Sequence, residues 1–141
     1  DVDIVGVEYF VSEEKLVPME GLDEETEAAI LNLLYADIEA HETEDLDAVA
    51  ALYDPESPVA DLALELFGIL YALYDLDYDL EEIIIFYADE SEAFVYTVHT
   101  IVKTDDSDFT DLRVKSVHEL HNQEGGSWKF YRSYTLEQKP L

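Results

Sequence analysis

Few residues of this 141-residue chain could do acid–base chemistry, and the first two lie in a segment that we expect to be a helix. Asp37 and His41 are four residues apart, a spacing that puts two side chains on the same helix face. Both fall near the centre of an apolar arc, so we expect them to point inward. A buried carboxylate beside an imidazole can act as a base with its orienting partner. The structural alternative is an ion pair that stabilises the helix end.

Further candidates alternate along predicted strands, where every second residue shares a face. Ser116 and His118 lie on the expected inward face of the third strand, together with Val114 and Leu120. The fourth strand is expected to present one face that carries Trp128, Phe130, Arg132 and Tyr134. His99 is the candidate in the second strand, but both faces of that strand are apolar and the alternation does not choose between them.

These candidates divide by the chemistry that each could do. His118 and the Asp37–His41 pair are candidate general bases. Tyr134 is a candidate donor to a developing oxyanion. The candidate ligand-binding residues are His99, Ser116, Trp128 and Arg132. The competing interpretation treats the histidines as hydrogen-bonded core or interface residues, and the tyrosine and arginine as packing groups paired with a buried acid.

The sequence predicts no metal site and no cofactor. The chain has no cysteine, which excludes a zinc-thiolate site, a disulfide framework and a thiol nucleophile. Residues 75–81 begin like a calcium loop, but Leu80 stands where that loop needs glycine and Phe86 where it needs a bidentate glutamate. His118 and His121 are three residues apart, which puts them on opposite faces of a strand. The sequence contains no phosphate loop and no nucleophile elbow.

The charge of the chain is large and uneven. The sequence has 35 acidic and 7 basic side chains, a formal net charge of −28. Residues 1–94 hold 28 of the acidic side chains and one basic one, whereas residues 95–141 are nearly neutral. Ordinary nucleic-acid binding is excluded, because it needs a basic face. Either the surface is adapted to concentrated salt, in which the Debye length is about 3 Å, or it faces a basic partner. We favour salt adaptation.

The elements that must position the candidates follow from the hydrophobic periodicity. A helix is predicted over 23–42, with Asp23 as its N-cap and three glutamates in its first turn. A short helix over 44–53 follows, capped by Thr43, and a long apolar helix over 58–74 begins after Ser57. Alternation with a period of two predicts strands at about 80–88, 92–103, 111–122 and 127–137. The short connections between them imply an antiparallel meander.

The chain is expected to form one α+β domain with an extension. Residues 1–22 read as an N-terminal arm or strand, because a β-branched and aromatic run extends from Val2 to Val11, and residues 23–141 form the domain. No apolar run reaches the roughly 18–20 residues that span a membrane. The helix over 58–74 is apolar around most of its circumference, so we expect it to be covered on more than one side.

Three segments resemble the NTF2-like family, which includes the SnoaL-like and ketosteroid-isomerase-like proteins. The segment YADIEAHETEDLDAVAALYDPESP is similar to the family's opening helix pair. The segment EAFVYTVHTIVKT is similar to one of its alternating strands, and VHELHNQEGGSWKFYRSYTLE is similar to its closing hairpin. Together they cover roughly residues 24–137. The resemblance implies three helices on a curved antiparallel sheet, arranged as a cone with an open, largely apolar pocket. The helix over 58–74 departs from the family, which usually has a short strand or hairpin there.

The resemblance implies a pocket, but it does not identify a reaction. We expect a non-catalytic module that binds a small apolar ligand or a partner and forms a homodimer through its outer sheet face. One alternative is an isomerase- or dehydratase-type enzyme with a pocket carboxylate or histidine as base; another is an acidic inhibitor or DNA mimic. The family's strand-borne catalytic acids do not carry over, because the strand carboxylates here lie at strand ends or point outward. The location stays open between the cytoplasm of a salt-accumulating organism and, if a leader was removed, the outside of the cell.

Overall fold

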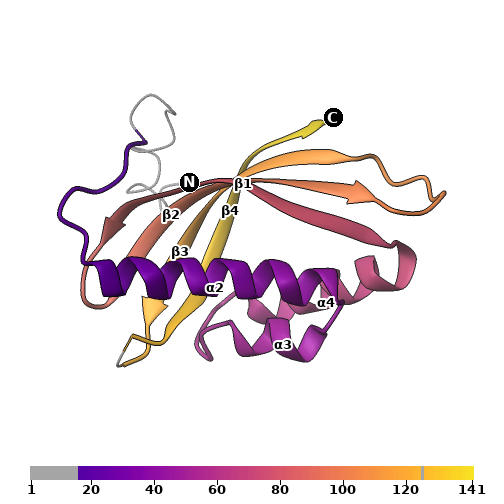
Figure 1. The fold of residues 1–141 in the computed structure, drawn as a ribbon. Helices are drawn as coiled ribbons and strands as arrows, with labels where there is room; N and C mark the ends of the chain where they lie inside the picture. Colours follow the sequence, from indigo (N-terminus) through magenta and orange to yellow (C-terminus); the bar gives the residue numbers. More distant parts are fainter. Residues whose placement is uncertain (1–15, 125) are drawn as a thin grey trace.

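The computed structural model describes residues 16–124 and 126–141 and shows three helices against one side of a four-stranded sheet (Figure 1). The helices are α2 (Glu24–Glu42), α3 (Leu46–Ala51) and α4 (Ala60–Leu73), and the strands are β1 (Leu76–Ala88), β2 (Glu92–Lys103), β3 (Leu112–Asn122) and β4 (Trp128–Pro140). Each strand pairs antiparallel with the next, in the order β1-β2-β3-β4. The predicted α+β meander is therefore confirmed. The run from Val2 to Val11, predicted to be a strand or an arm, lies outside the described residues.

The helix starts follow from local capping. The Asp23 carboxylate accepts a hydrogen bond from the third backbone N–H of α2 at 3.1 Å, as predicted. The cap of α3 is Asp45 rather than Thr43, since the Asp45 carboxylate accepts from the third N–H of α3 at 3.0 Å. Thr43 instead ends α2, where its hydroxyl donates to a carbonyl of the last turn at 3.0 Å. The Asp45 carboxylate therefore caps α3 in place of the Thr43 hydroxyl that the sequence predicted.

Helix α4 is less covered than the sequence predicted. It begins at Ala60, two residues later than expected, and none of its residues is fully buried. Its exposed face carries Leu62, Leu66, Ile69 and Leu73, each 51–60% exposed. The described part of the chain therefore covers one side of this helix, and the expected second cover is absent from that part. Neither this helix nor any other described one is long and apolar enough to cross a bilayer.

The main core lies between α2 and the inner face of the sheet. Ile30 is fully buried, and Leu33 and Leu34 lie beside it on the same helix. They pack with inward residues from all four strands, which are Ile85, Ala88, Ala93, Val95, Leu120, Trp128 and Phe130. Removing this apolar surface from water is what holds the helix to the sheet.

The outer face of the sheet is also apolar. Tyr96, Val98 and Val117 are buried there in a second cluster, together with Leu16 from the chain before α2. This explains why the sequence could not choose between the faces of β2: both are buried, and the face that carries His99 is the inner one. The homodimer through the outer face stays a prediction.

Two β-bulges in β4 change which side chains face inward. Leu120 pairs with Phe130 and Glu119 pairs with Arg132, so Tyr131 is an extra residue in β4. The face shared by Trp128 and Phe130 therefore ends at Phe130. Beyond the bulge, Tyr134 lies in the outer cluster, so the prediction of one continuous face through Arg132 and Tyr134 is wrong. A second extra residue, between the partners of Lys115 and Ser116, follows near the end of the strand.

Asp54 joins the end of α3 to the last hairpin. Its side chain is almost fully buried, and its carboxylate accepts from the Gln123 side-chain amide at 2.9 Å and from the Glu56 backbone at 2.8 Å. Its own backbone N–H donates to the Phe130 carbonyl at 2.9 Å. These bonds fix the segment between α3 and α4 along β4, the edge strand, and so set where α4 closes over the sheet.

We expect Asp54→Ala to lower the free energy of unfolding by about 2 kcal/mol, because the partly buried hydrogen bonds from the Gln123 amide and the Glu56 backbone to a charged acceptor are lost. Urea denaturation followed by circular dichroism measures the change. Asp106→Ala, in an exposed turn, is the control and should shift the midpoint little. Equal midpoints for the two variants would contradict the role given to Asp54.

Candidate functional site

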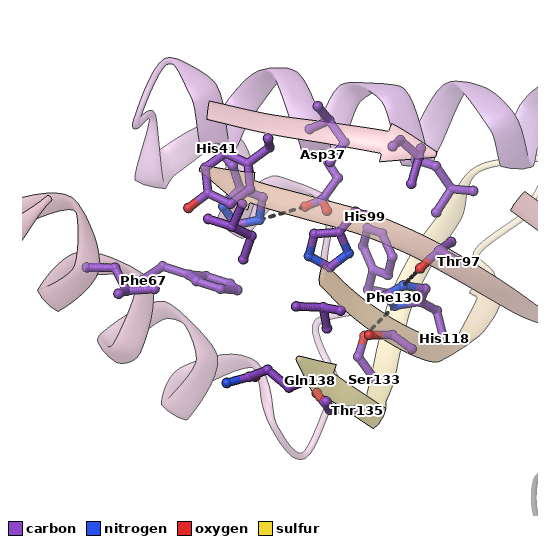
Figure 2. A pocket seen from close by; sticks show the side chains of 18 of the residues that line it. Asp37, His41, Phe67, Thr97, His99, His118, Phe130, Ser133, Thr135 and Gln138 are labelled. Carbon is purple, nitrogen blue, oxygen red and sulfur yellow. Dashed lines mark hydrogen bonds and ion pairs between the residues drawn. The ribbon is translucent and has the colours of Figure 1, made fainter. Parts of the chain in front are cut away.

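A cavity of about 270 Å³ lies between α2, α4 and the inner face of the sheet. Figure 2 shows its wall, with Asp37 and His41 on α2, Phe67 on α4 and the remaining labelled side chains on the strands. Most of its lining is apolar, and the polar side chains come from both α2 and the sheet. The full lining is Leu34, Asp37, Ile38, His41, Tyr53, Phe67, Leu70, Tyr78, Leu80, Thr97, His99, Ile101, Val114, Ser116, His118, Phe130, Ser133, Thr135 and Gln138.

Five of the eight candidates from the sequence line this cavity, and three do not. Those that do are Asp37, His41, His99, Ser116 and His118. Trp128 is buried in the main core beyond the cavity. Tyr134 lies in the outer cluster, and Arg132 contacts the Tyr131 ring with its guanidinium 5.5 Å from the ring centroid. The bulge at Tyr131 accounts for the last two.

The structure adds cavity residues that sequence reasoning missed. Ser133 and Thr135 reach the cavity from β4 because the first bulge turns them inward, and Gln138 lies on the same face because the second bulge restores the original alternation. Tyr53 comes from the end of α3 and Phe67 from α4. The sequence pattern around the aromatic residues does not distinguish a cavity wall from a packed core. The sequence also contains no pattern that predicts the two bulges.

On the α2 side, His41 is held on both ring nitrogens. Its Nε2 lies 3.2 Å from the Asp37 carboxylate, and its Nδ1 lies 2.6 Å from the Tyr71 hydroxyl. The ring also packs edge-on against Phe67, with centroids 4.5 Å apart. His41 is 7% exposed. With both nitrogens engaged, this imidazole orients Asp37 and ties α2 to α4 rather than offering a free base.

On the sheet side, His118 is held in the same way by two hydroxyls. Its Nε2 lies 2.9 Å from Thr97 Oγ1 and its Nδ1 lies 2.7 Å from Ser133 Oγ. A neutral imidazole has one donor and one acceptor nitrogen, and a hydroxyl can satisfy either. Burial lowers the pKa of His118 to about 4, and the nearby Asp37 carboxylate opposes that change only in part. His118 is therefore neutral at pH 7.

His99 differs from the other two cavity histidines. It lies on β2 and lines the cavity between Asp37 and His118, and within the described chain its ring makes no hydrogen bond (Figure 2). Burial lowers its pKa, the Asp37 charge raises it and the His41 ring lowers it. A neutral imidazole with a free nitrogen beside a carboxylate can bind a polar group or accept a proton.

Tyrosine hydroxyls near Asp37 remain protonated over the physiological range. Burial raises the pKa of Tyr53 to about 12, with a smaller effect of the Asp37 charge. The pKa of Tyr78 is also raised to about 12, by burial first and then by Glu44 and Asp37. These side chains line the cavity as hydrogen-bond donors and not as phenolate bases.

The cavity has one acidic side chain and no lysine or arginine among the residues that line it. That acid, Asp37, keeps an oxygen that no described residue engages, since only its other oxygen pairs with His41. The arrangement offers acceptor capacity at Asp37 and either donor or acceptor capacity at His99. It offers no fixed cation for an anionic group.

We expect His118 to make the protein less stable as the pH falls from 6.5 toward 4. Because the folded pKa is about 4 and the unfolded value is near 6.5, the unfolded state takes up the proton first in this window. Stability is complete above about pH 6.5 and falls by up to about 3 kcal/mol by pH 4. Urea denaturation across this range, compared with His118→Asn, isolates the effect, because the carboxylates titrate in both proteins. Parallel profiles would show that the imidazole does not titrate as described.

The fold matches solved structures of low sequence identity. A ketosteroid isomerase-like protein from Erwinia carotovora atroseptica SCRI1043 is 21% identical over 82% of this chain and 99% of its own, with a TM-score of 0.59. The hexachlorocyclohexane dehydrochlorinase LinA-type3 from Novosphingobium barchaimii LL02 is 13% identical over 82% and 90%, with a TM-score of 0.63. A protein with a cystatin-like fold from Nostoc punctiforme PCC 73102 is 14% identical over 88% and 96%, with a TM-score of 0.67. At such identities these structures show the fold alone, an NTF2-like cone.

No curated protein matches the chain. A family model does match, over residues 32–141, and it describes the C-terminal domain of the anti-sigma-I factor RsgI9. The matched segment runs from within α2 to the last residue of the chain and contains every residue that lines the cavity. The chain therefore belongs to the RsgI9 C-terminal domain family and has an NTF2-like fold.

Proposed function

We propose that this domain binds a small, mainly apolar molecule in the cavity between α2, α4 and the sheet. The observation that carries the proposal is an apolar-walled cavity with a few polar groups that have free capacity, among them the Asp37 carboxylate and the His99 imidazole. Ligand sites of this kind pair a largely apolar wall with a few polar groups that fix orientation. A volume of about 270 Å³ is near the lower end of the usual range of roughly 300–1,000 Å³, which favours a small ligand.

The charge of the protein narrows the ligand class. No lysine or arginine lines the cavity, so an anionic group would enter a low-dielectric site without a counter-charge. The net charge of −28 adds a field that repels anions on approach. A neutral ligand with a hydroxyl or N–H can donate to Asp37 and keep its apolar part against Phe67, Leu70 and Val114. We therefore propose an uncharged ligand that carries one hydrogen-bond donor.

The family name suggests what such binding is for. The matching family is described as the C-terminal domain of an anti-sigma-I factor, a name that denotes a regulator acting on a sigma factor. A binding module attached to a regulator is well placed to report the presence of a molecule. We propose that the domain is a sensor whose cavity recognises the signal, with no reaction required of it.

We expect N-phenyl-1-naphthylamine, a neutral apolar fluorophore with one N–H, to bind with a saturable rise in fluorescence. Leu70 lines the cavity from α4, so Leu70→Trp should fill the cavity and weaken binding at least about tenfold, equivalent to about 1.4 kcal/mol. The anionic dye 1-anilinonaphthalene-8-sulfonate should bind much more weakly, because the cavity gives its charge no partner. Titrations followed by fluorescence measure both dyes.

Leu73→Trp is the matched control, because Leu73 lies on the same helix but is 60% exposed and does not line the cavity. Its affinity for the neutral dye should stay near that of the unmodified protein. If both tryptophan variants bind the dye equally well, the dye lies elsewhere and the cavity is not the binding site.

A second function, an acid–base enzyme, is favoured by one observation. His99 is a neutral imidazole with no hydrogen bond to the described residues, and it lies near a carboxylate inside an apolar cavity. Removal of a proton next to a carbonyl needs such a base and a nearby donor, and the hydroxyl of Tyr53 supplies the donor. We propose His99 rather than His118 as the base, because both nitrogens of His118 are engaged, while Asp37, oriented by His41, stays the alternative base.

Deuterium exchange of 2-tetralone, a neutral bicyclic ketone, tests the enzyme alternative. If the domain is an acid–base enzyme, the protein should accelerate α-proton exchange in D₂O about a hundredfold or more over buffer, and His99→Gln should abolish the acceleration. Proton NMR follows the loss of the signal. His121→Gln, on the opposite face of the sheet, is the control. Exchange at the buffer rate with the unmodified protein would leave the binding function and remove the enzyme.

A further inference from the structure

Three side chains of the kinds that bind metal ions gather on the outer face of the sheet, away from the cavity. Glu92 begins β2, and Glu119 and His121 lie near the end of β3. One carboxylate oxygen or ring nitrogen from each lies within 4.8 Å of the others. Glu92 and His121 face each other across the β2–β3 pair, and Glu119 is two residues away on the same face. Regular strands rather than loops therefore hold all three.

The ring of His121 is already oriented toward the two glutamates. It stacks on Tyr131 with centroids 3.9 Å apart and an interplanar angle of 13°. Its Nε2 lies 2.8 Å from the Glu119 carboxylate, and its Nδ1 lies 3.5 Å from the carboxylate of Asp54. Metal-binding histidines commonly place a carboxylate behind the nitrogen that does not bind the ion, which fixes the ring and its tautomer. Asp54 has that position here.

Two basic side chains lie near this cluster, and both are held by other groups. Lys129 pairs with His121 across the last hairpin, but its ammonium donates to the Ala51 carbonyl at 2.7 Å. Arg132 pairs with Glu119 in the sheet and is attracted by the Glu119 charge, but its guanidinium lies over the Tyr131 ring and bonds the Tyr134 side chain. With the three carboxylates of Glu92, Glu119 and Asp54 around one imidazole, the acidic groups outnumber these neighbours.

We propose that Glu92, Glu119 and His121 form a binding site for one divalent transition-metal ion, oriented from behind by Asp54. An imidazole with carboxylates suits zinc and its neighbours, whereas magnesium and calcium prefer oxygen ligands alone. Ligand atoms about 2.0 Å from a tetrahedral ion lie roughly 3.3 Å apart, so the spacing within the cluster needs only small side-chain rotations. The side chains of His121 and Glu119 are 28% and 16% exposed, which leaves room for water at the remaining position.

The placement of the site suggests a structural role that is independent of the cavity. The ion would join the start of β2 to the end of β3, beside the point where Asp54 fixes the chain between α3 and α4. Binding to the folded state alone raises stability. The site would therefore strengthen the end of the cone where the helices meet the last hairpin.

Calorimetric titration with Zn²⁺ tests the site, with molar KCl and excess Mg²⁺ present so that the general acidic surface is screened and occupied. We expect one saturable Zn²⁺ site and a rise in Tm on zinc addition. His121→Gln and Glu119→Gln should each weaken zinc binding at least about tenfold, and Asp54→Asn about tenfold through loss of ring orientation. Near-ultraviolet circular dichroism confirms that each variant is folded. Glu92→Gln is a further variant, which changes the partly exposed third ligand.

Two controls separate this site from others in the chain. Glu82→Gln changes an exposed carboxylate of β1 outside the cluster, and His99→Gln changes a cavity imidazole. Both should keep the zinc affinity of the unmodified protein. With Co²⁺ as the probe, the visible spectrum should change on His121→Gln and not on His99→Gln. The proposal is overturned if no saturable site is found, if His121→Gln binds zinc as tightly as the unmodified protein, or if His99→Gln is the variant that loses it.

Discussion

One extra residue in β4 decides which side chains reach the cavity. Up to Phe130 the strand follows the regular alternation, and the insertion of Tyr131 reverses it. Ser133 then meets His118 on the inner face, while Arg132 and Tyr134 turn outward. A bulge also increases the twist of the strands, which helps the sheet to curve around α2. Without it, a guanidinium would stand in the cavity wall, and His118 would lose one of its two partners.

The same bulge marks the limit of what the sequence could predict. Periodicity gave the order of the elements and, in the regular strand β3, placed Ser116 and His118 on the inner face, where the structure has them. It could not place a single extra residue, because Arg132 and Tyr134 are amphipathic and suit either face. The faces of β2 stayed undecided for a different reason, namely that the sheet buries both of them. The local sequence pattern indicates whether a side chain is buried, whereas a bulge changes which face of the sheet the side chain points to.

Charge is separated between the surface and the cavity. The chain carries 35 acidic side chains, yet Asp37 alone among them lines the cavity, where His41 engages one of its oxygens. The surface acids act on a ligand through the long-range field, which salt screens, whereas Asp37 is partly buried and acts at contact, where salt screens much less. The two effects therefore separate experimentally. Salt should change how fast a charged molecule arrives far more than how well a bound one is held.

The partners of the ring nitrogens, rather than residue type, distinguish the four histidines. His41 and His118 have partners on both nitrogens and tie elements together. His99 lines the cavity with a ring that no described residue bonds, so a ligand would be its partner. His121 has carboxylates at both nitrogens, and carboxylates can share a cation in a way that hydroxyls at a neutral imidazole cannot. The sequence alone does not distinguish the four imidazoles. The neighbours that the fold places around them give His41 and His118 a structural role and leave His99 and His121 able to bind a ligand or an ion.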